Sequence, residues 1–211
     1  MALTRFSELE SALVDQQVDF MKLASNHSLV TRDYPLKSAP KNWIKVVTGV
    51  RRSGKSVFCI QNVAVSSTVY ANFDDDRLFG LKATELQSVY ELLLKVKPAL
   101  STVILDEIQN IPGWELFVAR LHRTGIKVWV TGSNSKLLSS ELATHLTGRA
   151  FPIELFPFSL RETLAAKKIP HNSSSLGRAA ILKVFEDQVK TGGFPEVVLG
   201  DVPGPYLRTL F

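Results

Sequence analysis

The stretch VVTGVRRSGKSVF, residues 46–58, decides the fold of this 211-residue chain. Small apolar residues lead into a glycine and two arginines, Gly54-Lys55-Ser56 follow, and the sequence then becomes apolar again. Residues 49–56 match the pattern G-x-x-x-x-G-K-[ST] at every fixed position. A glycine-rich turn lets successive backbone N–H groups face inward around a phosphate, beside a helix amino end that favours anions. The stretch therefore predicts a phosphate-binding loop between a strand and a helix.

The residue types of this loop have complementary chemical roles. Lys55 is placed to reach the β- and γ-phosphates of a nucleotide, and the Ser56 hydroxyl is placed to ligate magnesium. A chance match is the alternative, but the apolar strand before the loop and the apolar helix after it are the context that the motif requires. Arg51 and Arg52 could contact a phosphate or a neighbouring subunit. The alternative is that both side chains are solvated, as loop arginines usually are. The residues predicted to bind nucleotide here are Gly49, Arg51, Arg52, Ser53, Gly54, Lys55, Ser56 and Val57.

Beyond the loop, short apolar runs typical of strands alternate with longer helical patterns. The predicted strands are Ile44–Thr48, Thr68–Phe73, Thr102–Asp106, Lys127–Thr131 and Phe151–Phe156. Helices are predicted to start at Gly54, near Thr84, at Gly113 and near Ser135. This alternation indicates an α/β fold of three layers with a parallel five-stranded sheet, because parallel strands need crossovers and both sheet faces must be buried. Ligands of such sheets bind at the carboxyl ends of the strands.

Asp106 and Glu107 end one of these apolar strands, in the stretch STVILDEIQN. A strand-end aspartate can hold magnesium through water, and an adjacent glutamate can orient and deprotonate an attacking water. The alternative is a solvated strand-end pair, but a protein that only held nucleotide would not need the second carboxylate. With the strand at Thr68–Phe73, Glu107 also suggests the P-loop proteins with an additional catalytic glutamate. In that group another strand lies between the loop strand and the acid strand.

The stretch KVWVTGSNSKLL places Thr131, Ser133 and Asn134 after the next strand. A short polar side chain here could hydrogen-bond the γ-phosphate or the attacking water. The alternative is a turn that caps the following helix, for which Ser and Asn are favoured. The position after the acid strand favours a sensor role, with Asn134 as the preferred residue.

Composition limits the class of protein. The chain is 45% apolar and 21% charged, and no apolar run approaches the roughly 20 residues that span a bilayer. Its start lacks the uncharged core of a signal peptide, so we expect a cytoplasmic protein without a membrane partner. The single Cys59 is expected to be a small buried residue, and the four scattered histidines give no support to a zinc site. The net charge of +5 leaves an anionic partner open.

Three segments are expected along the chain. Residues 1–40 form a helical segment and a linker, with one helix face carrying Phe6, Leu9, Leu13, Val18, Phe20 and Leu23. Residues 41–158 form the P-loop core, and residues 159–211 form a small appendage with helices in SLRETLAAKK and SLGRAAILKVFEDQVKTGG. The chain ends in YLRTLF without a capping glycine or polar tail, from which we expect a longer protein with a further domain.

Several stretches in unbroken order resemble one family. They are TGVRRSGKS, VYANFDDDRL, VILDEIQNIPGWE, VTGSNSKLLSSELATHLTGR, IELFPFSLRE and GGFPEVV. From about residue 29 onward the chain is similar to a bacterial and archaeal family of AAA-type P-loop ATPase domains. In that family the ATPase domain is normally followed by a second domain of unknown or nuclease-like character. The resemblance implies residues 49–56 as Walker A, Asp106 and Glu107 as Walker B, and Ser133-Asn134 as sensor.

The resemblance also implies roles for residues outside these motifs. Arg149 in LTGR is a candidate arginine finger, acting in cis or from a neighbouring subunit, with an ordinary surface arginine as the alternative. GGFPE, residues 192–196, resembles the Gly-x-Pro element of signalling-type P-loop ATPases, in which the proline lies near the adenine. Pro195 is therefore a candidate adenine contact, with a tight turn as the alternative. Asp74–Asp76 are a family hallmark to which we assign no step.

Taken together, the residues and the resemblance predict a magnesium-dependent ATPase. Its expected cofactors are ATP and Mg²⁺, its expected metal ligands are Ser56 and Asp106, and its expected catalytic residues are Glu107, Lys55, Asn134 and Arg149. The first rival is a signalling switch that binds ATP with slow or no turnover. A kinase is disfavoured because we find no arginine-rich lid or substrate pocket in the sequence. A homo-oligomer is a further expectation, and a DNA partner reached through the further domain is only left open by the mild basicity.

Overall fold

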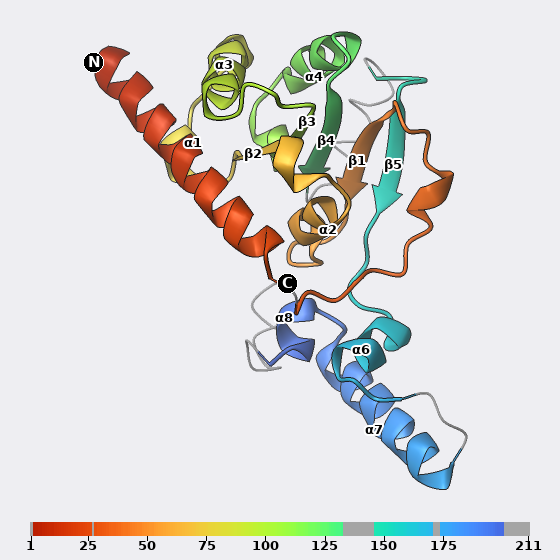
Figure 1. Cartoon of the computed structure of the whole chain (residues 1–211). Coiled ribbons are helices and arrows are strands. Elements are labelled where there is room, and N and C mark those ends of the chain that lie inside the picture. The colour runs from red at the N-terminus through yellow and green to blue at the C-terminus, as the bar shows by residue number, and fades with distance from the viewer. Residues whose placement is uncertain (1, 27, 133–145, 171–173, 201–211) are drawn as a thin grey trace.

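The computed structural model, drawn in Figure 1, describes residues 2–26, 28–132, 146–170 and 174–200. Its centre is a sheet of five parallel strands in the order β2-β3-β4-β1-β5. The strands are β1 (Ile44–Thr48), β2 (Thr68–Asn72), β3 (Thr102–Asp106), β4 (Lys127–Gly132) and β5 (Ala150–Glu154). The predicted α/β fold with a parallel five-stranded sheet is thereby confirmed.

The order of the strands brings the predicted motifs to one edge of the sheet. β1 and β3 have the predicted bounds. Each of the other three strands begins and ends within two residues of its predicted bounds. β4 lies between β1, which leads into the glycine loop, and β3, which ends in Asp106. This confirms that another strand separates the loop strand from the acid strand. Because all pairs are parallel, the glycine loop and the acid pair follow the same carboxyl-terminal edge.

Helices bury both faces of the sheet. α3 (Leu86–Val96) and α4 (Trp114–Arg123) pack on one face together with the first half of the N-terminal helix. α2 (Lys55–Gln61) covers the other face, where Phe58 packs edge-on against Trp129 of β4. Cys59 is fully buried in this layer, as predicted, and burial raises the pKa of its thiol. The helix predicted near Ser135 falls outside the described residues.

Helix α1 (Ala2–Ala24) lies along the edge strand β2 and departs from the predicted apolar face. Leu13 and Phe20 are buried as expected, but the side chains of Phe6 and Val18 are exposed. Between the two buried anchors, the inward face instead carries two glutamines, residues 16 and 17. The prediction was wrong there because it looked for apolar residues, whereas α1 faces the polar edge of a strand.

The two glutamines complete the hydrogen bonding of strand β2. Gln17 donates from Nε2 to the carbonyl oxygen of Tyr70 and accepts from the Tyr70 N–H at 3.0 Å. Gln16 forms the same pair with Asn72, at 3.1 Å and 2.9 Å. The edge of a sheet leaves backbone N–H and C=O groups unpaired, which costs free energy when a helix covers them. Two side-chain amides therefore take the place of a sixth strand.

A helical appendage extends from the carboxyl-terminal edge of the sheet (Figure 1). It consists of α6 (Leu160–Ala166), α7 (Ser175–Thr191) and the short α8 (Pro195–Val198), of which α6 and α7 were predicted. α6 begins with a capping box, in which the Ser159 hydroxyl accepts from the Glu162 N–H and the Glu162 carboxylate accepts from the Ser159 N–H. None of the helices in the described ranges is long and apolar enough to cross a membrane.

Candidate functional site

The loop between β1 and α2 has a backbone that only glycine allows at its first position. Gly49 has a φ of 147°, and a Cβ atom there would lie 2.1 Å from the carbonyl oxygen of Leu155. Gly54 closes the loop with a φ of 89°, also in the left-handed region, but a Cβ there would have room. The loop is therefore folded tightly against the end of β5, and its last residue leads directly into α2.

Lys55, the first residue of α2, closes over this loop. Its side chain is 4% exposed, and Nζ donates to the carbonyl oxygens of Gly49 and Val50 at 3.3 Å and 3.2 Å. The same ammonium group lies 3.6 Å from Oε1 of Glu107. An anion entering the loop would therefore meet a buried positive charge that is already in place.

Two further features of the loop fit a bound polyphosphate. The Ser53 hydroxyl is buried inside the loop, and within the described part of the chain its Oγ has no hydrogen-bond partner. A cavity of ≈ 1030 Å³ adjoins the loop and is lined there by Arg52, Lys55, Ser56 and Val57. Ligand pockets measure about 300–1,000 Å³, so this cavity has room for a nucleotide.

Asp106 is buried at the end of β3, and a hydroxyl donates to each of its carboxylate oxygens. Thr131 of β4 donates to Oδ1, and Tyr70 of β2 donates to Oδ2. The Ser56 side chain lies near the same Tyr70 hydroxyl. Burial, followed by the Asp106 charge, raises the pKa of Tyr70 above its ordinary value of 10.0, so the hydroxyl keeps its proton. The Tyr70 hydroxyl thus contacts Asp106 and lies near Ser56, the two predicted metal ligands.

These ligands fit a hard cation such as Mg²⁺. Ser56 and Asp106 offer hydroxyl and carboxylate oxygens, and Mg²⁺ in proteins takes one or two such ligands together with waters and substrate phosphates. No group of three or more His, Cys, Asp or Glu side chains gathers among the residues that the structure describes. A cation at this position would therefore depend on the phosphates of a nucleotide for much of its coordination.

Glu107 follows in a strained backbone conformation. Its φ of 52° and ψ of 40° lie in the left-handed region, which costs a residue other than glycine about 1–3 kcal/mol. Its N–H donates to Thr131 Oγ1 at 3.0 Å, and its Oε2 accepts from Gln109 Nε2 at 2.5 Å. The side chain is 18% exposed and lies beside Lys55 at the cavity wall. A carboxylate is thus held where both water and a bound phosphate can reach it.

The two arginines of the loop point to different partners. Arg51 has a 70% exposed side chain and forms an ion pair with Asp74 at 2.9 Å. Arg52 lines the cavity and forms an ion pair with Glu196 of α8 at 2.6 Å. Arg52 therefore lies at the predicted ligand site, whereas Arg51 is absent from the cavity lining.

Asp75, the second acid of the NFDDD stretch, has a structural role. Its carboxylate accepts hydrogen bonds from Arg77 and Gln16. The hydrogen bonds from Arg77 lower the pKa of Asp75, burial raises it, and the bond from Gln16 lowers it, so the pKa lies below its ordinary value of 3.8. Arg77 also forms an ion pair with Asp15 of α1, in which Nη1 lies 2.7 Å from Oδ2. These contacts fasten α1 to the turn after β2.

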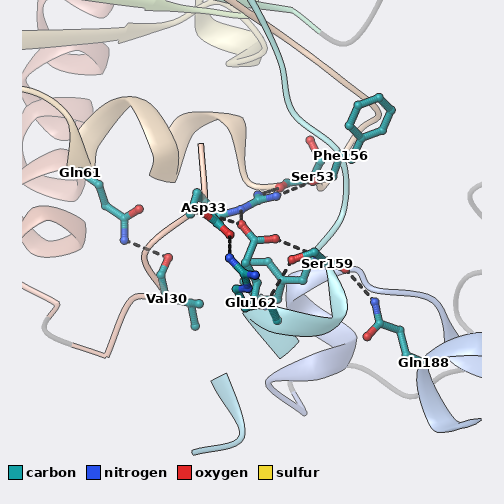
Figure 2. Close-up of polar contacts among 11 residues, drawn as sticks. Val30, Asp33, Ser53, Gln61, Phe156, Ser159, Glu162 and Gln188 are labelled. Atoms are coloured by element: carbon teal, nitrogen blue, oxygen red, sulfur yellow. Dashed lines mark hydrogen bonds and ion pairs between the residues drawn. The ribbon is translucent and has the colours of Figure 1, made fainter. Parts of the chain in front are cut away.

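Arg32, in the linker after α1, joins the loop to the appendage. Its side chain is 6% exposed and donates to the carbonyl oxygens of Ser53 at 2.7 Å and Phe156 at 2.6 Å. It also donates to Oε1 of Glu162 at 2.8 Å, and its Cζ lies 5.0 Å from the centre of the Phe158 ring. Figure 2 shows how Ser53, Phe156 and Glu162 converge. One buried cation therefore contacts the phosphate loop, the segment after β5 and helix α6.

Glu162 is the acceptor at the centre of this junction. Besides Arg32, the N–H groups of Asp33 and Ser159 donate to it at 2.9 Å and 2.8 Å. Burial opposes ionisation, but the hydrogen bonds from Arg32 and from the two N–H groups outweigh it, and the pKa of Glu162 is lowered from its ordinary value of 4.5. The pair Arg32–Glu162 is therefore ionic at neutral pH.

The cavity continues from the loop to an apolar wall shared by the linker and the appendage. Leu29 and Val30 line it from the linker, and Ala165 and Pro195 line it from α6 and α8. Cγ of Pro195 lies 3.7 Å from the position that a Cβ would take on Gly54. Pro195, the predicted adenine contact, is thus placed beside the loop and in the cavity wall.

One of the predicted catalytic residues, Arg149, is not brought to this cavity. Arg149 is exposed at the amino end of β5, where its carbonyl oxygen accepts from the Ile44 N–H at 2.8 Å. Ile44 starts β1 and the loop follows Thr48, so Arg149 is about 16 Å from its own loop at about 3.3 Å per strand residue. Asn134, with its neighbour Ser133, falls outside the described residues.

Sequence reasoning missed the residues that support this site from distant parts of the chain. Three such residues donate hydrogen bonds to the site. Tyr70 donates to Asp106, Gln109 donates to Glu107, and Arg32 donates to the loop at the Ser53 carbonyl oxygen. No spacing rule connects them, because Tyr70 and Arg32 act across 36 and 21 positions. A weak signal was present, since a tyrosine inside an apolar strand needs a polar partner for its hydroxyl once it is buried.

Comparison with known proteins identifies a family. A family model described as an AAA domain matches residues 41–164. An uncharacterised protein of Methanocaldococcus jannaschii is 35% identical over 203 residues, which cover 90% of this chain and 46% of that protein. An uncharacterised protein of Haemophilus influenzae is 36% identical over 174 residues, which cover 77% of this chain and 42% of that protein. The chain spans less than half the length of both relatives.

A solved structure, that of C. elegans PCH-2, is similar with a TM-score of 0.48 and 14% identity, covering 96% of this chain and 66% of that chain. The fold of the present chain is established by its own strand order. The family match includes the loop, the acid pair and Glu162, while α1 and Arg32 precede it.

Proposed function

Because the chain belongs to the AAA domain family of P-loop ATPases, we propose that it binds ATP with Mg²⁺ and hydrolyses the terminal phosphate. The observation that carries the proposal is the meeting of Lys55 and Glu107, 3.6 Å apart, at the glycine loop and the large cavity. A cation there attracts a phosphate, and a carboxylate beside it can accept a proton from water. Both groups are needed for hydrolysis, whereas binding alone needs only the first.

Phosphate oxygens would replace the loop carbonyls as acceptors for Lys55. Its present bonds to Gly49 and Val50 measure 3.3 Å and 3.2 Å, at the long end of the range for N–H···O bonds. Bonds between an ammonium group and an anion are shorter and roughly twice as strong. The buried hydroxyl of Ser53, which has no hydrogen-bond partner among the residues that the structure describes, supplies a further donor within the loop.

The apolar wall of the cavity suits the base of the nucleotide. Leu29 and Val30 of the linker and Pro195 of α8 present apolar side chains to the cavity. An aromatic base gains free energy by burying its faces against such side chains. This supports the prediction that Pro195 contacts the adenine.

Ser56 and Asp106 are the residues that would hold Mg²⁺. When bound, the cation would neutralise charge on the phosphate oxygens and so favour departure of the leaving group. Asp106 accepts hydrogen bonds from Thr131 and Tyr70, so its carboxylate has a fixed orientation. Two oxygens with about four lone-pair directions still leave Asp106 able to accept from water or a cation.

Glu107 acts as the general base in this proposal. The water oxygen bonds to the γ-phosphorus, and one water proton passes to the Glu107 carboxylate. The bond between the γ-phosphorus and the bridging oxygen breaks, and its electron pair remains on ADP. Gln109 holds Oε2 of Glu107 at 2.5 Å, and Lys55 lies near Oε1, so the carboxylate is oriented before water arrives.

A second copy of the chain would supply Arg149. The exposed position of Arg149 at the opposite edge of the sheet suits contact with another subunit and not with its own loop. An arginine supplied in trans stabilises charge in the transition state and can raise turnover by about 10³–10⁵-fold. The proposal therefore includes a homo-oligomer, with Asn134 of each chain as its sensor.

A nucleotide-dependent switch is the second candidate function. Two ion pairs, Arg52–Glu196 and Arg32–Glu162, connect the loop region to the appendage. A phosphate that attracted Arg52 would compete with Glu196 and thereby alter how α8 is held. Such a protein would change conformation with ATP but turn over slowly.

The test compares ATP binding and phosphate release in the wild-type chain, Lys55→Ala and Glu107→Gln. We expect Lys55→Ala to weaken binding at least about tenfold, because charge-assisted bonds to phosphate are lost. Glu107→Gln should bind as the wild type does and lose turnover by about 10²–10⁴-fold. Lys37→Ala and Glu91→Gln, at exposed positions outside the cavity lining, are the matched controls.

Each outcome separates the two candidate functions. Unchanged ATP binding by Lys55→Ala would overturn the nucleotide site itself. Turnover in Glu107→Gln equal to that of the wild type would remove Glu107 from the reaction. Tight binding without steady turnover, accompanied by an ATP-dependent change in limited proteolysis of the appendage, would favour the switch.

A further inference from the structure

The hydroxyl of Tyr70 occupies a position that the phosphate and metal motifs do not explain. Tyr70 lies on the edge strand β2, opposite Ile104 of β3, and its side chain packs with the layer under α2. From there its hydroxyl donates to Asp106 Oδ2 and lies near Ser56. It therefore touches one of the two residues that would hold Mg²⁺ and lies near the other.

Helix α1 fixes this tyrosine in three ways. Gln17 pairs with both the carbonyl oxygen and the N–H of Tyr70. The ring of Phe20, one turn further along α1, stacks on the Tyr70 ring with centroids 5.9 Å apart and planes 7° apart. Phe20 is itself 2% exposed, so the stacked pair has little freedom to move.

We propose that Tyr70 is a positioning residue for the metal-binding end of the site, and that α1 serves to hold it there. Each oxygen of Asp106 accepts one hydroxyl, from Tyr70 and Thr131, and this fixes the carboxylate plane and the direction of its remaining lone pairs. The inference rests on the proposed function, because it concerns the cation that the function requires.

A purely structural role is the competing explanation. A buried tyrosine hydroxyl needs a hydrogen-bond partner, and Asp106 would satisfy it whether or not a cation binds. The two explanations differ in what the hydroxyl changes. A structural hydroxyl affects only the free energy of unfolding, whereas a positioning hydroxyl affects the Mg²⁺ concentration needed for tight nucleotide binding.

The experiment measures binding of a fluorescent ATP analogue in EDTA and then at rising Mg²⁺ concentration. Tyr70→Phe keeps the ring that stacks on Phe20 and removes only the hydroxyl. Tyr90→Phe is the matched control, because this tyrosine of α3 packs on Phe117 away from the cavity. We expect Tyr70→Phe to bind as the wild type does in EDTA but to need about tenfold more Mg²⁺ for half-maximal enhancement, while Tyr90→Phe is unchanged.

Phe20→Leu is a second variant, which keeps the hydroxyl and loosens its support. We expect a smaller increase of the Mg²⁺ midpoint, in the same direction. An unchanged midpoint in both variants, with or without a lower denaturation midpoint, would overturn the proposal and assign Tyr70 a structural role. A wild-type chain that bound the analogue equally well in EDTA and in Mg²⁺ would instead overturn the metal site of the proposed function, and this proposal with it.

Discussion

Gly49 and Gly54 occupy the two fixed glycine positions of one motif, yet the structure restricts them differently. Both have positive φ angles, of 147° and 89°. Only Gly49 also faces a backbone atom, the Leu155 carbonyl oxygen, at a distance that no Cβ tolerates. The motif alone therefore identifies both glycines, but it does not indicate that the first one is fixed by the neighbouring strand end.

This difference predicts unequal effects of alanine at the two positions. Gly54→Ala should cost about 1–3 kcal/mol of unfolding free energy, from backbone strain alone. Gly49→Ala should cost a further 1–3 kcal/mol or so, because the segment after β5 must move. Chemical denaturation of both variants measures the difference, and equal losses would contradict the steric role of Leu155.

Candidate site residues could be proposed from the sequence, because the glycine loop, the acid pair and the proposed metal ligands are local motifs whose chemistry demands particular residue types. The structure places Lys55, Ser56 and Glu107 in the lining of one cavity, and Asp106 directly precedes Glu107 at the end of β3. Arg149 shows the limit of such reasoning. The sequence motif indicates that an arginine at this position is characteristic of the family. Only the strand register shows that Arg149 lies at the amino-terminal edge of the sheet, opposite the edge that carries the loop.

At the scale of single elements, α1 is the part that the sequence pattern described least well. Apolar periodicity identified the helix and its anchors Leu13 and Phe20. Gln16 and Gln17 were not among the residues of the predicted helix face, although their amides pair with β2 over more than 50 positions in sequence. Contacts of side chains with a distant backbone leave no periodic signal, so this arrangement could not be predicted.

Hydrogen exchange tests how these amides hold the edge of the sheet. We expect Gln17→Ala to speed exchange of the Tyr70 N–H and Gln16→Ala to speed exchange of the Asn72 N–H, because each loses its acceptor. Each should also lower the unfolding free energy by about 1–3 kcal/mol, the cost of leaving a covered polar group unpaired. The two variants control for each other, and exchange that rises equally at both amides in both variants would contradict residue-specific pairing.

At the scale of the whole molecule, the junction around Arg32 unites parts that are far apart in the chain. Arg32 and Glu162 are separated by 130 positions, and all five strands of the sheet lie between them in the sequence. Their pairing connects the linker after α1, the phosphate loop and the appendage. Nothing in the spacing of the sequence indicates such a contact, because it depends on how the complete sheet brings the two ends together.

The junction predicts a pH-dependent contribution to stability. At neutral pH, Glu162→Gln should lower the unfolding free energy by about 3 kcal/mol, because Arg32 remains buried without its counter-charge. The folded-state pKa of Glu162 lies below that of the unfolded chain, so ionic Glu162 stabilises the fold above pH 4.5 and this contribution is lost on acidification through the folded-state pKa. The difference between wild type and variant should therefore shrink below pH 4.5.

Denaturation curves of both proteins over this pH range measure the effect. Glu186→Gln, at an exposed position of α7, is the matched control and should match the wild type at every pH. A difference between wild type and Glu162→Gln that stayed constant with pH would show that the carboxylate charge contributes nothing.

The covering of β2 by α1 also concerns anyone who prepares a shortened form of this protein. A recombinant piece limited to the family match, residues 41–164, would retain the five described strands, the glycine loop and the acid pair. It would also expose the edge of β2 and leave the Glu162 carboxylate without Arg32. An uncovered strand edge recruits strands from other molecules, so we expect such a piece to aggregate on expression. The smallest soluble unit should therefore start at α1, some forty residues before the family match begins.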